Sequence, residues 1–351
     1  MQDYERDKIF NAIEIFFINE FSDEISLISQ VKEISVNDYS YCFEFSSKGE
    51  DYFVKIPKFE QLVLRKNKPV LTFSNEDILF AKAEYFSLLK LRDQTKVKDI
   101  SCIEVIVYIE EINAIITKKF HGNDFYLLLR RYSLDLSKKS QKRAVLLFDN
   151  LITFYISAVQ NVHDDSKEYN SQETISKIQK YISSIGADIE NESIFLENEL
   201  KMTNLPTKRL ITGYKGFDIR NVIYSDLNIL AILDPGKEKI ESIESYFSRI
   251  YATLIIIYWG HLFLLFGTKL HKDLLDSFEE RIMHKINPIT FHLELRKELY
   301  KHWDMAIFAL RKKSWPKLIK DILQTIYVDS FYKKVLKENK IRIIDVLKVV
   351  K

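Results

Sequence analysis

The stretch "ITGYKGFDIRNVIYSDLNILAILDPGK", residues 211–237, decides how this sequence is interpreted, because it holds three of the eight glycines in a chain of 351 residues. Two β-rich runs, "NVIY" and "ILAILD", flank the polar segment "SDLN", which is typical of a β-hairpin. A turn centred on Leu227 and Asn228 predicts that Asn221 and Asp234 face each other at the open end of the hairpin, with alpha carbons about 4.5 to 5.5 Å apart.

An amide oxygen and a carboxylate at one end of a hairpin are hard oxygen ligands. They suit Mg²⁺, which usually keeps water and substrate phosphate as its other ligands. On the same geometry, Asn221 could instead cap a loop, and Asp234 could begin the turn before Pro235 and Gly236. The residues alone leave both interpretations open.

The composition limits the classes of protein that need to be considered. A chain of this length with 46% apolar residues can bury a large core, as one two-lobed domain or two ordinary ones. Its 52 basic and 50 acidic residues give a formal charge of +2, so no global field favours nucleic acid or an anionic membrane, and a phosphate site would have to be local. Two cysteines cannot form a disulfide framework or a zinc cluster, and "MQDYERDK" is not a signal peptide. We therefore expect a cytoplasmic protein without a nucleic-acid partner.

One segment, "IYATLIIIYWGHLFLLFG" at residues 250–267, is about as apolar as a membrane span needs to be. Gly260 and His261 lie at its centre, and a charge-rich stretch precedes it closely. We interpret it as a buried helix of a helical subdomain, with a membrane-embedded helix as the alternative.

The order of hydrophobic patterns predicts an α+β protein. Residues 1–30 have helical spacing, and a period of two follows in "VKEIS", "YCFEFSS" and "YFVKIPK", with a turn at Gly49. Residues 74–91 predict a helix with a Ser cap, and "CIEVIVYIE" and "NAIITKKF" predict two more strands. Helical patterns dominate after "FYLLLRR", apart from the hairpin. A small sheet lobe followed by a helical lobe, with a cleft between them, is the expected arrangement.

The corresponding domain boundaries are a helical extension at 1–30, an N-terminal sheet lobe at 31–120, and a helical C-terminal lobe at 121–351. The last carries the hairpin at 211–237 and ends in a helical extension.

The hairpin stretch resembles the catalytic and metal-binding loops of the protein-kinase-like superfamily, in its aminoglycoside phosphotransferase and small-molecule or glycan kinase branch. "FDIRNVIY" and "DPG" match these loops, so the resemblance implies that Asn221 and Asp234 bind Mg²⁺, although Pro235 replaces the usual aromatic residue. The resemblance also implies a bilobal kinase-like fold and ATP as the second cofactor.

Other parts of the pattern follow in the same order. "YFVKIPK" resembles the strand that carries the phosphate-contacting lysine, here Lys55. "AKAEYFSLLKL" resembles the helix whose glutamate pairs with that lysine, which implies Glu84, with Glu76 as the alternative. "IITKKFHGNDF" resembles the passage between the lobes, where backbone groups of Lys118, Lys119 and Phe120 would meet the adenine.

Two departures from the pattern matter. The turn in "SVNDYSY" has no glycine to wrap phosphates, although Ser40 and Asn37 could donate to them. The position of the catalytic aspartate, five residues before Asn221, is occupied by Gly216, so Asp218 is the candidate base.

Lys215 and Arg220 flank this loop. They could hold an anionic acceptor or the γ-phosphate, or they could be solvated loop charges.

Three hypotheses follow. The first is an ATP-dependent phosphotransferase acting on a hydroxyl of a small molecule or glycan. The second is a pseudokinase-like module that binds nucleotide without transferring phosphate. The third is a helical interaction protein associated with a membrane through residues 251–266.

Overall fold

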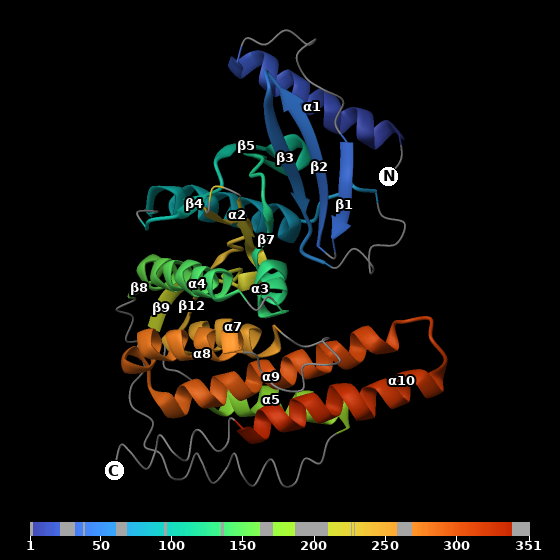
Figure 1. Cartoon of the computed structure of the whole chain (residues 1–351). Coiled ribbons are helices and arrows are strands. Elements are labelled where there is room, and N and C mark those ends of the chain that lie inside the picture. Colours follow the sequence, from blue (N-terminus) through green and yellow to red (C-terminus); the bar gives the residue numbers. More distant parts are fainter. Residues whose placement is uncertain are drawn as a thin grey trace. The chain divides into compact units, whose positions relative to one another are not determined.

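The structure, a computed structural model, divides into two compact units (Figure 1). Unit 1 comprises Met1–Leu127, Thr153–Ala158 and Tyr214–Lys239, and unit 2 comprises Leu128–Ile152, Val159–Gly213 and Ile240–Lys351. The described residues are 3–21, 32–37, 39–60, 69–94, 97–134, 137–161, 171–186, 210–225, 227, 229–257 and 269–338.

Unit 1 contains a five-stranded sheet in the order β1-β2-β3-β6-β5, in which all neighbours are antiparallel. Lys48 and Gly49 have positive φ values of 51° and 79°, which close the two-residue turn between β2 and β3 at the glycine expected there. The period-two segments thus form the predicted strands. Their bounds are β1 (Lys32–Asn37), β2 (Ser40–Ser47), β3 (Glu50–Pro57), β5 (Val105–Ile109) and β6 (Ala114–Lys118).

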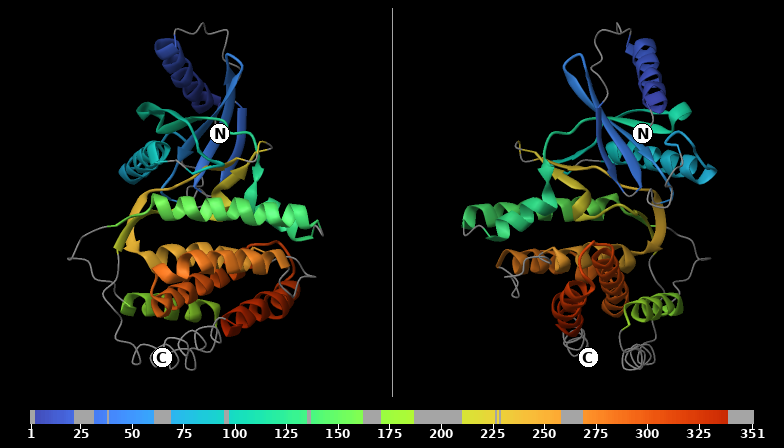
Figure 2. Two further views of the ribbon diagram at one scale, coloured as in Figure 1. Left: turned by 60° about the vertical axis from the view of Figure 1, so that its left-hand side comes forward. Right: turned by 90° about the vertical axis from the view of Figure 1, so that its right-hand side faces the viewer.

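Helix α1 (Asp3–Phe21) packs on this sheet (Figure 2). Ile9, Ile13 and Phe17 share one buried cluster with residues of β2 and β3, and the ring of Phe17 meets that of Phe45 edge-on at 5.2 Å. The helix predicted over residues 1–30 is confirmed from Asp3 to Phe21, and residues 22–30 lie outside the described part of the chain.

Helix α2 (Asn75–Gln94) begins after the expected serine cap. Ser74 Oγ accepts from the Asp77 N–H at 3.2 Å, and Asp77 Oδ2 accepts from the Ser74 N–H at 3.0 Å, a reciprocal cap. The other Asp77 oxygen accepts from the N–H of Phe59, just beyond β3, at 2.8 Å. This carboxylate therefore fixes the start of α2 against the end of β3. The 3-10 turn η3 (Glu110–Ile112) joins β5 to β6.

The hairpin belongs to unit 1 and to a four-stranded sheet in the order β4-β11-β10-β7. β10 and β11 are antiparallel, as predicted, but the register places Val222 opposite Ile232. Leu233 therefore faces Asn221, and its N–H donates to the Asn221 carbonyl at 2.9 Å. The prediction that Asp234 lies opposite Asn221 is wrong by one residue. The bounds are β4 (Ile100–Cys102), β7 (Asn123–Asp124), β10 (Val222–Tyr224) and β11 (Leu230–Ile232).

The reason for this shift lies in the loop. The N–H of Ser225 donates to the Ile229 carbonyl at 2.9 Å, and the Ile229 N–H donates to Ser225 Oγ at 3.3 Å. The loop thus closes between Ser225 and Ile229, which centres it on Leu227. The predicted centre lay between residues 227 and 228, and this difference moves the strand pairing by one residue.

Unit 2 is mainly helical, and helices α3 and α4 contribute residues to both units. Within it, α9 packs against α5 and α7, and Asn287 caps α9 just before Pro288 at its first position. The helices are α3 (Phe125–Leu134), α4 (Lys138–Ala158), α5 (Ser171–Ile185), α7 (Ile243–Ile256), α8 (Lys269–Ile282), α9 (Pro288–Arg311) and α10 (Lys317–Leu323), with the 3-10 turn η5 (Met283–Lys285) and the π-helix η6 (Gln324–Asp329). A three-stranded sheet in the order β12-β9-β8 consists of β12 (Glu238–Ser242), β9 (Leu210–Tyr214) and β8 (Gln160–Asn161).

The apolar segment at 250–267 falls partly on α7. Tyr251, Ala252 and Leu254 are buried in unit 2, which agrees with a buried helix up to Ile256, whereas residues 258–268 lie outside the described residues. Among the helices that the structure describes, none is both long and apolar enough to cross a membrane.

Candidate active site

Lys55 lies between two carboxylates of unit 1. Its Nζ donates to Glu84 Oε1 at 2.6 Å and to Asp234 Oδ2 at 2.9 Å, across sequence separations of 29 and 179 residues. Lys55 sits in β3, which is hydrogen-bonded on both sides by β2 and β6. Glu84 lies on the capped helix α2, and Asp234 follows β11. Three of the predicted site residues are thereby brought together, while the alternative, Glu76, is exposed in the first turn of α2.

The three side chains differ in exposure, and the two carboxylates differ in the direction of their pKa shifts. The Glu84 side chain is 2% exposed, Lys55 17% and Asp234 41%. Burial, reinforced by the charge of Asp234, raises the pKa of Glu84 to about 7. Burial opposes ionisation of Asp234 as well, but the Lys55 ammonium outweighs it and lowers the pKa of Asp234. The more exposed carboxylate is thus the one that keeps its negative charge.

Lys55 remains a cation for a related reason. Burial alone would lower its pKa, but the attraction of Asp234 and Glu84 outweighs burial and raises the pKa above its ordinary value. Glu84 Oε2 is buried and has no hydrogen-bond partner among the described residues, so all of its hydrogen bonding there goes to Lys55 through Oε1.

Asn221 joins the two loops at the open end of the hairpin. Its Nδ2 donates to the Gly216 carbonyl at 2.7 Å and to the Asp234 carbonyl at 3.3 Å. The side chain thus meets Asp234 through the backbone rather than as a cross-strand pair.

Because Nδ2 is held on these two carbonyls, the amide presents Oδ1 as its acceptor. Asn221 Oδ1 and the Asp234 carboxylate are two hard oxygen donors, which fit Mg²⁺. No cluster of three or more His, Cys, Asp or Glu residues able to hold a metal occurs in the described part of the chain. A Mg²⁺ ion here would depend on phosphate oxygens and water for its other ligands.

Gly216 has no room for a side chain. A β-carbon at this position would lie 2.1 Å from the Asp234 carbonyl oxygen and 2.7 Å from the Pro235 carbonyl carbon. The Gly216 N–H donates to the Pro235 carbonyl at 2.7 Å, which holds the two backbones together. The glycine is therefore required by this close approach, and the position expected to carry the catalytic aspartate is sterically closed.

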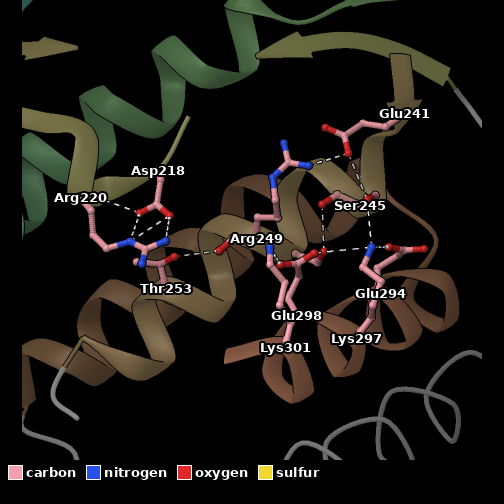
Figure 3. A network of polar contacts seen from close by, with 11 residues as sticks. Asp218, Arg220, Glu241, Ser245, Arg249, Thr253, Glu294, Lys297, Glu298 and Lys301 are labelled. Carbon is pink, nitrogen blue, oxygen red and sulfur yellow. Dashed lines mark hydrogen bonds and ion pairs between the residues drawn. The ribbon is translucent and has the colours of Figure 1, made fainter. Parts of the chain in front are cut away.

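Asp218 caps the short 3-10 turn η4 (Ile219–Asn221). Its Oδ1 accepts from the Arg220 N–H at 3.0 Å, and the Arg220 guanidinium binds both carboxylate oxygens through Nε at 3.1 and 3.2 Å and through Nη2 at 2.5 Å (Figure 3). The candidate base is thus paired with one of the two cations predicted for phosphate or acceptor binding. Lys215, the other cation, is exposed, and its N–H donates to the Lys237 carbonyl at 3.0 Å.

An aromatic stack supports this loop. The ring of Phe217 stacks on Tyr155 at 4.5 Å and on Tyr214 at 4.8 Å, and the Tyr155 hydroxyl donates to the Asp218 carbonyl at 3.3 Å. Sequence reasoning did not identify Tyr155 or Phe217. The alternation of aromatic and polar residues in "YKGFD" could have indicated Phe217, because an aromatic residue this close to a candidate base has to be packed, whereas Tyr155 lies in α4 with no such signal.

Backbone hydrogen bonds limit which groups of Lys118, Lys119 and Phe120 could contact an adenine. The N–H of Lys118 donates to the Glu104 carbonyl at 2.8 Å and that of Lys119 to the Asp51 carbonyl at 2.7 Å. These two amides are therefore occupied, and Phe120 packs against a buried cluster that includes Leu88. Any contact of this passage with a base would use its carbonyl groups or the Phe120 amide.

Ser40, at the start of β2, does not lie where a hydroxyl that donates to phosphate was expected. Ser40 is 3% exposed and its Oγ lies 3.6 Å from Cys42 Sγ, so its hydroxyl is directed into the unit. The side chain of Asn37 lies outside the described residues.

Comparison with known proteins gives the fold. A search of protein-family models found no match, and neither did a search of curated proteins. Among solved structures, an aminoglycoside phosphotransferase from Ralstonia eutropha JMP134, itself assigned only provisionally, is 12% identical and matches with a TM-score of 0.58 over 92% of this chain and 97% of its own. The chain has the aminoglycoside phosphotransferase fold.

Two further structures resemble this one. A thermostable mutant of aminoglycoside phosphotransferase APH(4)-Ia, in a ternary complex with ADP and hygromycin B, is 9% identical with a TM-score of 0.50, over 92% of this chain and 98% of its own. A choline kinase from Streptococcus pneumoniae is 12% identical with a TM-score of 0.49, over 95% and 99%. The predicted α+β, kinase-like fold class is confirmed, and the identity is low enough that the chain is divergent.

Proposed function

We propose that this protein is an ATP-dependent phosphotransferase that transfers the γ-phosphoryl group to a hydroxyl of a small molecule or glycan. The observation that carries the proposal is the position of Lys55 between Glu84 and Asp234. Phosphoryl transfer needs positioning and neutralisation of charge more than covalent help. A buried lysine held as a cation by two carboxylates, one of them accessible, provides both.

Each residue has a defined part in this proposal. Lys55 holds the α- and β-phosphates, and Glu84 orients the lysine. Asn221 and Asp234 would hold Mg²⁺, which when bound neutralises charge on the phosphate oxygens. Because the structure leaves no room for a side chain at Gly216, Asp218 is the carboxylate proposed to accept the proton of the acceptor hydroxyl.

The ion pair between Asp218 and Arg220 implies that an acceptor would have to displace Arg220 before Asp218 could take up a proton. While the guanidinium occupies both oxygens of Asp218, the carboxylate is a poor proton acceptor. An acceptor with an anionic group would draw Arg220 away and leave Asp218 available. We therefore favour an acceptor that carries a negative charge near its reacting hydroxyl.

The second candidate function is a nucleotide-binding module without transfer activity. The closed position at Gly216 favours it, because the usual base cannot be accommodated there. The base is not decisive by itself, since proton transfer typically contributes about 10²- to 10⁴-fold. The third hypothesis, a helical interaction protein associated with a membrane through residues 251–266, is less favoured, because the chain has an α+β, kinase-like fold.

Binding is tested first. Thermal unfolding is followed with increasing Mg-ATP for the wild type and for Asp234→Ala, and the proposal expects stabilisation of the wild type alone. No stabilisation of the wild type at saturating nucleotide would exclude both nucleotide-binding functions.

Transfer is tested next, with γ-labelled ATP and a panel of neutral and anionic hydroxyl compounds. We expect Asp218→Ala to lower the rate about 10²- to 10⁴-fold while Mg-ATP still stabilises the protein. Asp273→Ala is the matched control, because Asp273 is also ion-paired, with Lys269 at 2.9 Å, but lies in α8 of unit 2. A wild type that binds Mg-ATP yet transfers no more than Asp234→Ala supports the module instead.

A further inference from the structure

An apolar stripe lies exposed on unit 2, near the end of the described chain. Its members are Trp315, Leu318, Ile319, Ile322 and Ile326, which are 45% to 70% exposed. The spacing of Leu318, Ile322 and Ile326 places these three residues on one side of α10 and η6, and Trp315 lies in the bend just before α10. Such a stripe normally faces a protein core, but here it faces outward.

The chain that follows α10, namely η6 and the residues after it, packs against α9. The indole N–H of Trp303 in α9 donates to Asp329 Oδ1 at 2.8 Å, and its ring stacks on Tyr332 at 5.7 Å. Val328 and Tyr332 are each 2% exposed. The π-helix η6 is therefore fixed against α9, and α10, which precedes it directly, has no buried residue of its own (Figure 1).

Two more exposed apolar residues lie near the end of α9, before the turn to α10. Met305 is 50% exposed and Phe308 is 54% exposed. The turn that joins α9 to α10 is held by Lys320, whose Nζ donates to the carbonyls of Arg311 at 3.2 Å and Lys313 at 3.0 Å. The end of α9 and helix α10 thus carry exposed apolar residues on both sides of a turn that is held by hydrogen bonds.

This surface is also strongly basic. Residues 305–328 contain five basic residues and one acidic residue, an excess of four positive charges in a chain whose total formal charge is +2. The remainder of the chain is accordingly net negative. Four of the basic residues are exposed, and the fifth, Lys320, holds the turn. The four exposed basic residues are Arg311, Lys312, Lys313 and Lys317.

We propose that this surface, the α9–α10 patch of residues 305–326, binds to the face of an anionic phospholipid bilayer. Exposed Trp, Leu and Ile side chains beside lysines are the combination that lies in a bilayer interface, with apolar groups at the acyl boundary and ammonium groups among the headgroups. This attachment would be peripheral, because the stripe covers about three turns of helix on a folded unit. It does not depend on the proposed phosphotransferase activity.

The charge decides against a second copy of the chain as the occupant. An isologous dimer through this patch would bring two surfaces with an excess of four positive charges each into contact. An anionic bilayer supplies both the apolar volume and the counter-charge.

The test is cosedimentation of the full chain with vesicles of phosphatidylcholine alone or with about 30% phosphatidylserine. We expect binding to the anionic vesicles only, weakening as salt is raised. The triple variant L318S/I322S/I326S should bind at least about tenfold more weakly, and K312E/K313E/K317E roughly 100-fold more weakly. All six side chains are exposed, so thermal unfolding of both variants should match the wild type.

The matched control is K138E/K139E/K142E on α4, which makes the same change in net charge at exposed lysines away from the patch. It should bind anionic vesicles within about twofold of the wild type. Tryptophan emission should shift to shorter wavelength on binding, and W315F should remove that shift.

Three results would overturn the proposal. Equal loss of binding in the α4 control would mean that net charge alone acts. A wild-type dimer that L318S/I322S/I326S converts to monomer, without vesicle binding, would assign the stripe to a second copy. Binding only after removal of residues 339–351 would mean that this segment of the chain occupies the stripe.

Discussion

Two groups of charged side chains, one in each unit, differ in how their charges balance. In unit 2, three glutamates meet three cations across α7, β12 and α9 (Figure 3). The pairs are Arg249 with Glu241 at 2.6 Å, Lys297 with Glu294, Lys297 with Glu298 at 3.5 Å, and Lys301 with Glu298 at 3.0 Å. In unit 1, one lysine serves two carboxylates.

This difference separates a structural cluster from a candidate site. The unit 2 cluster is neutral when all its members are ionised, and its glutamates are at most 6% exposed, so its charges balance without a ligand. The unit 1 group carries one surplus negative charge and exposes it on Asp234. Burial and the charge of Asp234 raise the pKa of Glu84, so a proton on Glu84 can remove the surplus, as could a bound cation. The unbalanced group with one accessible member is therefore the candidate for a metal and nucleotide site.

The largest expected effect comes from breaking the balanced group. Lys297→Ala would leave Glu294 and Glu298 buried without their shared cation, and we expect a loss of about 3–5 kcal/mol in the free energy of unfolding. Urea unfolding measures it, with Lys177→Ala, an exposed i,i+4 pair with Glu173, as the control that should change stability by less than about 1 kcal/mol. A loss for Lys297→Ala no larger than that of the control would contradict a structural role.

Breaking the unbalanced group should affect ligand response more than folding. Lys55→Ala should abolish stabilisation by Mg-ATP and lower any transfer rate by about 10²- to 10³-fold, because a preorganised charge on the phosphates is lost. Lys58→Ala is a useful comparison, since Lys58 lies just beyond the same strand but donates to the carbonyls of Val70 at 2.6 Å and Thr72 at 3.0 Å. Lys58→Ala should lower the free energy of unfolding yet still be stabilised by Mg-ATP. If Lys58→Ala instead loses the response to Mg-ATP and Lys55→Ala keeps it, the proposed roles of the two lysines are wrong.

The two groups should also respond to pH in opposite directions. Burial and Asp234 raise the pKa of Glu84 from 4.5 to about 7, so the folded state binds its proton more tightly than the unfolded state does. Stability from this group is therefore full below about pH 4.5 and falls as the pH rises to about 7, by about 3 kcal/mol at most. Burial opposes ionisation of Glu298, but Lys301 and Lys297 outweigh it and lower its pKa to about 2, so its contribution is present above about pH 4.5 and is lost toward pH 2.

Unfolding measured between pH 2 and pH 8 tests this contrast without nucleotide. Glu84→Gln should reduce the fall in the free energy of unfolding between about pH 4.5 and 7. Glu298→Gln should reduce its increase as the pH is raised from about 2 to about 4.5. The same slope in both variants as in the wild type would show that neither group controls the profile.

Much of this architecture follows from local patterns, whereas the details of the site do not. Periodicity predicted the strands of unit 1, the capped helix α2 and the hairpin, and the order of motifs selected Lys55, Glu84 and Asp234 from a sequence that offers Glu76 as well. The hairpin register was wrong by one residue because the loop closes between Ser225 and Ile229, in part through a side chain, Ser225 Oγ, which centres it on Leu227. The occupied amide of Lys119 depends on a pairing with a distant strand, which no local pattern encodes.

The smallest expected effect concerns the residue that most obviously breaks the resemblance. Gly216→Asp would restore the expected catalytic carboxylate in the sequence, but its β-carbon would meet the Asp234 carbonyl at 2.1 Å, and that carbonyl also binds Asn221. We expect about 1–3 kcal/mol of destabilisation and a weaker response to Mg-ATP, with no gain in transfer. Gly186→Asp is the control, since a β-carbon there meets nothing within 4 Å, although its φ of +72° adds backbone strain. If Gly216→Asp instead folds normally and accelerates transfer, the loop can open enough to admit a base, and the missing aspartate alone separates this chain from an ordinary phosphotransferase.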